Sequence, residues 1–180
     1  MITQAMEGDG TALLVSQLFD HYSDAIFAYL YRLVDNRETA EELVQETFLR
    51  AFKARSQLNA IENRRAWLYR VATNVAFDAL RRGRRFTWLP WSQADELHAP
   101  RPDVADAARE RDSVERALAA LPLDYRAALL LYVYYGLTVH EVAGALGIRE
   151  GAAKMRIRRA REMFRKAYGP HEDGVGGGLP

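Results

Sequence analysis

Four basic residues in the C-terminal third of the chain recur at the spacing of a single helix face. They are Lys154, Arg158, Arg161 and Arg165, separated by 4, 3 and 4 residues. On a helix this spacing gives one cationic ridge. Such a helix fits the major groove of DNA, where Arg and Lys donate hydrogen bonds to guanine and bind phosphates. A salt-bridged helix of a bundle would need acidic neighbours at i+4, and only Glu150 and Glu162 are available. The spacing therefore predicts a DNA-binding helix.

The residues before this ridge predict the helix-turn-helix motif that would position it. Pro122 can open a helix over 123–135, and Gly136 can end it. Thr138 and Glu141 have capping-box spacing, which predicts the start of a short second helix. Gly147 can take the left-handed conformation that ends this helix, and apolar residues at 153, 157, 160 and 164 predict the buried face of the next one. Helix, glycine turn and helix together form the helix-turn-helix motif.

A second basic stretch, over residues 64–85, mixes charge with aromatic and amide side chains. Seven arginines accompany one acid, Asp78, and the same stretch contains Trp67, Tyr69 and Asn74. Cations, stacking surfaces and amides are what a site for single-stranded bases uses. Trp67 lies within one turn of the apolar stripe through Leu68, so we expect it in the core rather than on bases.

An acidic helix is predicted over residues 38–53, upstream of this stretch. Between residues 20 and 50, seven acids outnumber three arginines. Leu43, Val44, Thr47 and Ala51 recur at helical spacing and leave a polar, largely acidic face outside. Such a face is poor for DNA and is suited to another protein.

The hydrophobic periodicity along the whole chain is helical, and no sustained alternation of period two appears, so the fold class is all-α. We expect two small helical domains, at 11–85 and 113–169, with the helix-turn-helix in the second. A flexible linker over 86–112 is predicted from Pro90, Pro100 and Pro102 and from six acids against three basic residues. Residues 170–180 have too few apolar side chains to offset the entropy of ordering, which predicts a disordered tail.

Composition narrows the function classes further. The absence of cysteine excludes disulfides and thiolate zinc sites. The apolar runs fall short of the ~20 residues that a membrane span needs, and no basic-then-apolar leader opens the chain, so we expect a cytoplasmic protein without a membrane span. His21, His98, His140 and His171 are too scattered to pair at i, i+4 on one helix, so we expect no metal, no cofactor and no enzyme activity. The rival enzyme class is a helical metal-dependent nuclease or hydrolase. A nuclease assay with magnesium would test for that activity.

Three groups of segments resemble a known protein family. They are ALAALP at 117–122 with GLT at 136–138, EVA at 141–143, LGI at 146–148 and GAAKMRIRRAR at 151–161; AEELVQETFLRAF at 40–52; and RAWLYRVATN at 65–74. The first group looks like region 4 of the extracytoplasmic-function sigma factors, and the others are similar to regions 2.2 and 2.4. A helix-turn-helix alone is common, but both region 2 segments ahead of it, in order, make the resemblance specific.

The resemblance implies an alternative sigma factor that binds core RNA polymerase and directs transcription initiation. It implies contact with the double-stranded −35 element through Lys154, Met155, Arg156, Arg158, Arg159 and Arg161. It implies contact with the melted, single-stranded −10 element, next to a loop over 58–65 that holds a flipped base, through Asn63, Arg65, Arg70, Asn74, Asp78 and Arg81. It implies docking on the polymerase β′ clamp through Glu41, Glu42, Gln45, Glu46, Phe48, Leu49 and Arg50, with Phe48 or Leu49 as an apolar anchor. The β flap is a further implied polymerase contact, and an anti-sigma factor is a candidate partner.

Two positions depart from the pattern of the family. Met155 stands where relatives often have a small hydroxyl residue, and Arg158 where they often have an aromatic residue or histidine. Because Arg158 can donate two hydrogen bonds and Met155 none, we expect readout to favour guanine at the position that Arg158 reaches, with Arg156 on phosphate. The alternative function is a helix-turn-helix activator with an N-terminal sensory half. That half would usually contain strands and an aspartate at a strand end, and the sequence predicts neither.

Overall fold

The computed structural model describes residues 2–86 and 105–169, and every element within these ranges is helical. The N-terminal unit contains α1 (Ile2–Val34), α2 (Arg37–Lys53), the 3-10 helix η1 (Arg55–Ala60) and α3 (Arg64–Phe86). The C-terminal unit contains α4 (Ala105–Ala119), α5 (Leu123–Leu129), the π-helix η2 (Leu130–Tyr134), α6 (Val139–Leu146) and α7 (Glu150–Tyr168). The predicted all-α class is confirmed.

Local signals explain where the helices of the N-terminal unit begin. Asp35 takes a left-handed φ of 53° between α1 and α2, which turns the chain. The Asn36 side chain accepts a hydrogen bond from the Thr39 amide at 2.8 Å and caps α2. In the same way Asn63 accepts from the Ala66 amide at 2.9 Å at the start of α3. These caps fix where α2 and α3 begin, and the buried apolar residues of each helix decide which of its faces remains outside.

The structure adds one feature to the predicted linker. Helix α4 begins at Ala105, so residues 105–112 of the predicted linker are helical. The physical reason is that Pro102 is the last proline of this stretch and an alanine-rich segment of good helix formers follows it. The other linker residues, 87–104, and the predicted tail, 170–180, lie outside the described residues. Helix α1 begins before residue 11, although Thr11 is the first buried side chain that the structure describes.

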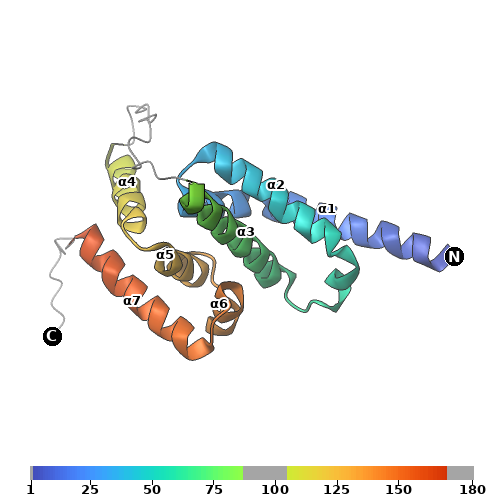
Figure 1. Ribbon diagram of the computed structural model, residues 1–180. Helices are drawn as coiled ribbons and strands as arrows, with labels where there is room; N and C mark the ends of the chain where they lie inside the picture. The colour runs from blue at the N-terminus through green and yellow to red at the C-terminus, as the bar shows by residue number, and fades with distance from the viewer. Residues whose placement is uncertain (1, 87–104, 170–180) are drawn as a thin grey trace, which may run out of the picture.

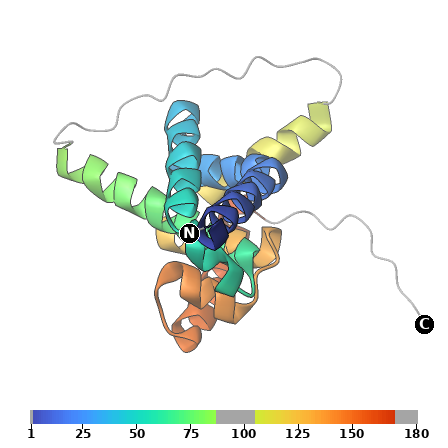
Figure 2. The same cartoon turned by 90° about the vertical axis from the view of Figure 1, so that its right-hand side faces the viewer.

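The two units pack against each other. Figure 1 shows α3 of the N-terminal unit facing α5 and α6 of the C-terminal unit, and the units remain in contact in the turned view of Figure 2. Buried side chains of both units form one continuous hydrophobic cluster. Within it Tyr135, from the end of η2, lies against Tyr29 of α1 and Tyr69 of α3. The sequence predicts two domains on a flexible linker and does not predict this packing.

Candidate nucleic-acid and polymerase interfaces

The helix-turn-helix is formed by α6 and α7, and its predicted caps are confirmed. The Thr138 amide donates to Glu141 Oε2 at 2.7 Å, and the Glu141 amide donates to Thr138 Oγ1 at 3.2 Å, which is a complete capping box. Gly147 ends α6 with a φ of 64°, and the Ile148 amide donates to the Ala143 carbonyl at 3.0 Å. The buried face of α7 then fixes which of its side chains face solvent.

The cationic ridge (Lys154, Arg158, Arg161 and Arg165) lies on the exposed side of α7. All four residues line one hollow of about 340 Å³, together with Tyr132 of η2 and Val139 of α6. The Arg161 guanidinium lies over the Tyr132 ring at 5.2 Å, and Arg158 pairs with Glu162 at 3.7 Å. Both partners of that pair are more than half exposed, so the pair leaves Arg158 available to a nucleic acid. Met155 and Arg159 are also exposed on this helix.

Arg156 differs from its neighbours on α7. Its side chain is only 24% exposed, and it pairs with Asp124 of α5 at 3.5 Å and lies 6.0 Å from the Tyr125 ring. Of the six residues predicted for the −35 element, five are therefore exposed, and Arg156 turns toward α5.

The residues predicted for the −10 element fall into two groups. Arg70 and Asn74 are exposed on α3. Asn63 and Arg65 are exposed as well, but Asn63 donates from its Nδ2 to the Glu141 carboxylate and Arg65 donates to the Tyr135 carbonyl, so the C-terminal unit already engages both of these side chains. The Glu141 carboxylate, which belongs to the capping box of α6, therefore also accepts a hydrogen bond from Asn63 of the N-terminal unit.

Asp78 joins the predicted −10 site to the predicted polymerase site. Its carboxylate pairs with Arg81 at 2.7 Å and with Arg50 of α2 at 3.6 Å. Arg50 in turn pairs with Glu46 at 2.7 Å. These four residues form one ionic network between α2 and α3, so a change at Asp78 affects both faces.

The outer face of α2 carries Glu41, Glu42, Gln45 and Leu49 as exposed side chains, and we call this set the α2 face. Leu49 is 47% exposed, whereas Phe48 is 7% exposed and its ring meets that of Phe19 at 4.9 Å. Phe48 therefore packs in the core, and only Leu49 fits the predicted role of apolar anchor. Phe52, 43% exposed one turn further along, extends this apolar surface. Phe52 was not among the predicted residues, although its i+3 spacing from Leu49 places both side chains on one face of α2.

Several side chains that make contacts between the two units were not predicted from the sequence. Arg126 of α5 donates to the carbonyls of Arg32 and Leu33, at 3.1 and 3.4 Å, at the C-terminal end of α1. Arg32 pairs with Glu115 of α4 at 3.0 Å. Burial lowers the pKa of Arg126, raises the pKa of Tyr69 to about 12 and raises that of Tyr135 as well.

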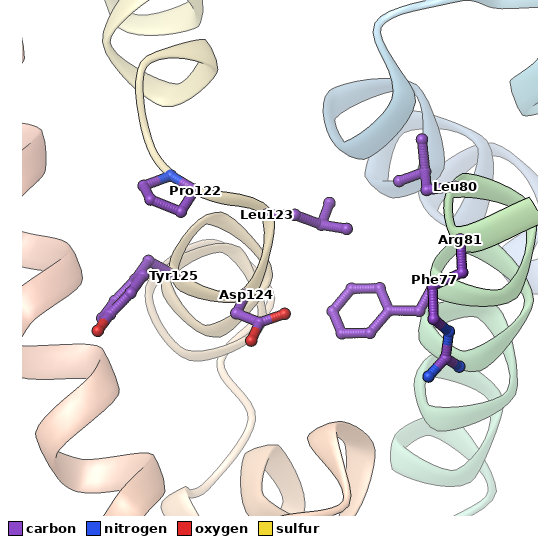
Figure 3. Close-up of a pocket in the computed structure, with 7 residues that line it drawn as sticks. All are labelled: Phe77, Leu80, Arg81, Pro122, Leu123, Asp124 and Tyr125. Atoms are coloured by element: carbon purple, nitrogen blue, oxygen red, sulfur yellow. The ribbon is translucent and has the colours of Figure 1, made fainter. Parts of the chain in front are cut away.

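One part of this interface is open. A cleft of about 380 Å³ separates α3 from the start of α5. In Figure 3 the side chains of Phe77 and Leu80 on α3 face Leu123 of α5 across it, with Arg81 and Asp124 also lining the cleft. The units are therefore in close contact around Tyr135 and are separated by a hollow at this cleft.

Two features of the described residues bear on other functions. Within 2–86 and 105–169, histidine and acidic side chains form no group that could hold a metal ion. Among the described helices, none has both the length and the apolar character that crossing a membrane requires.

Comparison with known proteins agrees with this geometry. The protein-family model for sigma-70 region 2 matches residues 18–86, and the protein-family model for sigma-70 region 4 matches residues 111–164. A helical unit of region 2 type followed by a helix-turn-helix unit of region 4 type defines a sigma factor of the sigma-70 family.

Individual relatives narrow the assignment. The chain is 31% identical to the ECF RNA polymerase sigma factor SigW of Bacillus subtilis over 92% of this chain and 93% of SigW. It is 34% identical to SigL of Mycobacterium tuberculosis over 86% of this chain and 88% of SigL. It is also 34% identical to SigE of Mycolicibacterium smegmatis over 86% of this chain, but it spans only 62% of SigE. The chain belongs to the extracytoplasmic-function (ECF) sigma factors, and it is an alternative sigma factor that directs transcription initiation.

Solved structures share the fold. The sigma factor RpoE in complex with the anti-sigma factor NepR from Bartonella quintana gives a TM-score of 0.65 at 25% identity, over 84% of this chain and 94% of RpoE. CnrH in complex with the cytosolic domain of CnrY gives 0.63 at 24% identity, over 91% of this chain and 92% of CnrH. The predicted family and function are confirmed, and the activator alternative is not favoured.

Proposed function

We propose that three separate surfaces of this sigma factor divide the work of initiation: the exposed side of α7 for the −35 duplex, α3 and its preceding loop for the −10 strand, and the α2 face for core polymerase. The observation that carries the proposal is the exposed cationic ridge on the second helix of a capped helix-turn-helix. A runoff transcription assay with core polymerase on a promoter library tests the whole proposal. Transcription from none of the library promoters would contradict it.

For the −35 element, the exposed residues Lys154, Met155, Arg158, Arg159 and Arg161 are the proposed contacts. Arg158 can donate two hydrogen bonds to a guanine edge, and Lys154 and Arg161 beside it can bind phosphates. Because Arg156 is paired with Asp124, we assign it a supporting role that can include a phosphate contact but no base reading.

For the −10 element, Arg70 and Asn74 are proposed contacts with exposed side chains, as are Asn63, Arg65 and Arg81. Asn63 and Arg65 are proposed contacts that must first leave their partners in the C-terminal unit. Asp78 and Arg81 support α3 through the ionic network with Arg50. A fluorescent adenine analogue in the −10 strand should brighten when its base leaves the stack in the holoenzyme. The Asn74→Ala variant should reduce that signal, and an unchanged signal would remove Asn74 from the site.

For core polymerase, the α2 face is the proposed contact with the β′ clamp, with Leu49 as its apolar anchor. The double variant Glu42→Lys and Gln45→Lys reverses one charge and adds another; it should weaken core binding in a pull-down and leave the circular dichroism spectrum unchanged, since both side chains are exposed. Glu162→Lys, a reversal of an exposed acid on α7, serves as the matched control. Equal core binding by the double variant and the control would refute the assignment. Contact of the C-terminal unit with the β flap is part of the same proposal.

An anti-sigma factor is a further proposed partner. RpoE and CnrH, which share the fold, are each found in complex with another protein, and for RpoE that partner is an anti-sigma factor. Cytoplasmic location and the absence of enzyme activity also belong to this proposal, since transcription takes place where the chromosome is. Cell fractionation and a nuclease assay with magnesium test these two points. Recovery in the membrane fraction would contradict the first, and DNA hydrolysis would contradict the second.

A further inference from the structure

Met155 of α7 is a large apolar side chain that points into solvent. It is 40% exposed and does not belong to the hydrophobic cluster of the described residues. The buried residues Ala153, Ile157 and Ala160 define the inward side of α7. At about 100° per residue, Met155 lies roughly 160° from Ala153 and Ile157 and roughly 140° from Ala160, so it points away from the core. The packing of the protein therefore does not explain why this position is apolar.

The neighbours of Met155 on the outer face of α7 are cations. Arg158 and Arg159 follow it by three and four residues, which places them beside it on the helix surface, and both are exposed. In a helix-turn-helix, residues near the start of the second helix reach the base edges, and Met155 is the sixth residue of α7. Since the cations bring the phosphates of a duplex to this face, the apolar side chain between them is covered by the groove of the DNA.

The major groove offers such a side chain one apolar group. Guanine, adenine and cytosine present hydrogen-bond donors and acceptors there, and thymine presents a C5-methyl group beside its acceptor. A methionine side chain has no donor and only a weak acceptor, so it leaves the polar edges unsatisfied, whereas a methyl group needs no hydrogen bond. The unbranched side chain has three rotatable bonds and can follow the position of that methyl group. Thymine is therefore the base that fits Met155.

We propose that Met155 contacts the C5-methyl group of one thymine in the −35 element and sets a preference for thymine at that base pair. This inference rests on the proposed −35 function of α7. Met155 and Arg158 are about 4.5 Å apart along the helix axis, at about 1.5 Å per residue, and successive base pairs are about 3.4 Å apart. The thymine therefore lies within about two base pairs of the position that Arg158 reads.

Single replacements of thymine by deoxyuridine test the contact, because deoxyuridine lacks only the methyl group. The DNA is a promoter with the −35 sequence that the wild type prefers, and the protein is the full chain in the holoenzyme with core polymerase. Each thymine of the −35 element is replaced in turn, and the equilibrium affinity is measured. One replacement, within about two base pairs of the position that Arg158 reads, should weaken binding by the wild-type holoenzyme about fourfold, the value for one buried methyl group.

Variants of Met155 decide whether this residue makes the contact. Met155→Ala should bind the thymine and the deoxyuridine DNA with equal affinity. Met155→Leu keeps an apolar side chain and should retain the preference for thymine. Both variants should fold normally, since the side chain is exposed and alanine and leucine favour helices. Comparing the two DNAs with each variant isolates the pairwise contact from any general change in binding.

Met163→Ala is the matched control. Met163 is 41% exposed on the same helix, but it lies about 12 Å further along the axis and about 80° around it. Its loss should leave the effect of the methyl group intact. The proposal is overturned if no thymine methyl of the −35 element affects binding, if the effect survives in Met155→Ala, or if Met163→Ala also removes it.

Failure of the underlying −35 function gives a different result. Lys154→Ala and Arg158→Ala report on that function independently of any methyl group. If they weaken binding to the −35 element and Met155→Ala leaves the methyl effect unchanged, the inference about Met155 alone is wrong. If none of the three variants changes binding to the −35 element, α7 does not read it, and the inference and the proposed −35 function are both wrong.

Discussion

Replacement of Arg158 by alanine should reduce both affinity and selectivity for the −35 element. The side chain is 65% exposed, and its ionic partner Glu162 lies at 3.7 Å one turn along the same helix. An exposed pair of this kind contributes about 0–1 kcal/mol, so the variant should fold normally. A bidentate contact with guanine contributes about 1–3 kcal/mol of discrimination. Binding of the preferred element should therefore weaken about 5- to 150-fold, with the preference lost at one base pair.

Arg156→Ala on the same helix is the matched control. Arg156 is largely covered by α5 through Asp124 and Tyr125, so its removal should lower the melting temperature by about 2–4 °C. It should weaken all −35 sequences to a similar extent. The assay is selection from a randomised −35 duplex library with each variant, followed by titration of the winning sequences. If the Arg158 variant keeps the wild-type preference at every position, Arg158 binds phosphate and the argument for guanine readout is wrong.

Three further predictions concern stability. Thr138→Ala removes the hydroxyl of the capping box and should cost about 1 kcal/mol in the free energy of unfolding, measured with urea, whereas Thr138→Ser should restore it; equal stability of both would contradict the role of the cap. Tyr29→Phe removes the buried hydrogen bond to Thr73 Oγ1 at 2.8 Å and should cost about 1 kcal/mol in the same assay; no loss would mean that the bond is not formed in solution. Burial raises the pKa of Tyr69 to about 12 and that of Tyr135 as well, above the unfolded value of about 10. Their contribution is therefore fully present below about pH 10 and is lost as the pH rises toward 12, so thermal melts should show a steep fall there that Tyr135→Phe reduces; a flat profile would contradict this.

Local signals made the helix-turn-helix predictable. A capping box and a terminating glycine act within a few residues of each other, so Thr138, Glu141 and Gly147 could be assigned from spacing alone, and the structure confirms all three roles. The exposed ridge followed from the same helical period. On α2, however, the period left Phe48 and Leu49 undecided, because adjacent residues at the edge of an apolar stripe differ by only 100° of rotation. The contact of Phe48 with Phe19 places Phe48 in the core, and that contact joins two helices.

Contacts between the two units could not be predicted in this way. The hydrogen bonds of Arg126 to α1 join residues 93 and 94 positions apart, and no local pattern marks either partner. Tyr135 looked like the last residue of a helix before Gly136, and only packing shows that it fills the space between two tyrosines of the other unit. The proline-rich stretch predicted a flexible linker, and a prediction about the linker does not say how the two units pack against each other.

The arginines of this chain show why charge counting overstates a nucleic-acid surface. The stretch 64–85 contains seven arginines, yet Arg64 donates to the Leu58 carbonyl at 2.9 Å, Arg65 bonds the other unit, and Arg81 pairs with an acid. On α7 the ridge has fewer such partners, and its acid Glu162 is itself exposed. A guanidinium that bonds a carbonyl keeps its charge, but the N–H groups in that bond are not free to bond a phosphate or a base until the bond is broken. The two basic stretches therefore differ in how many of their arginines already have partners within the protein.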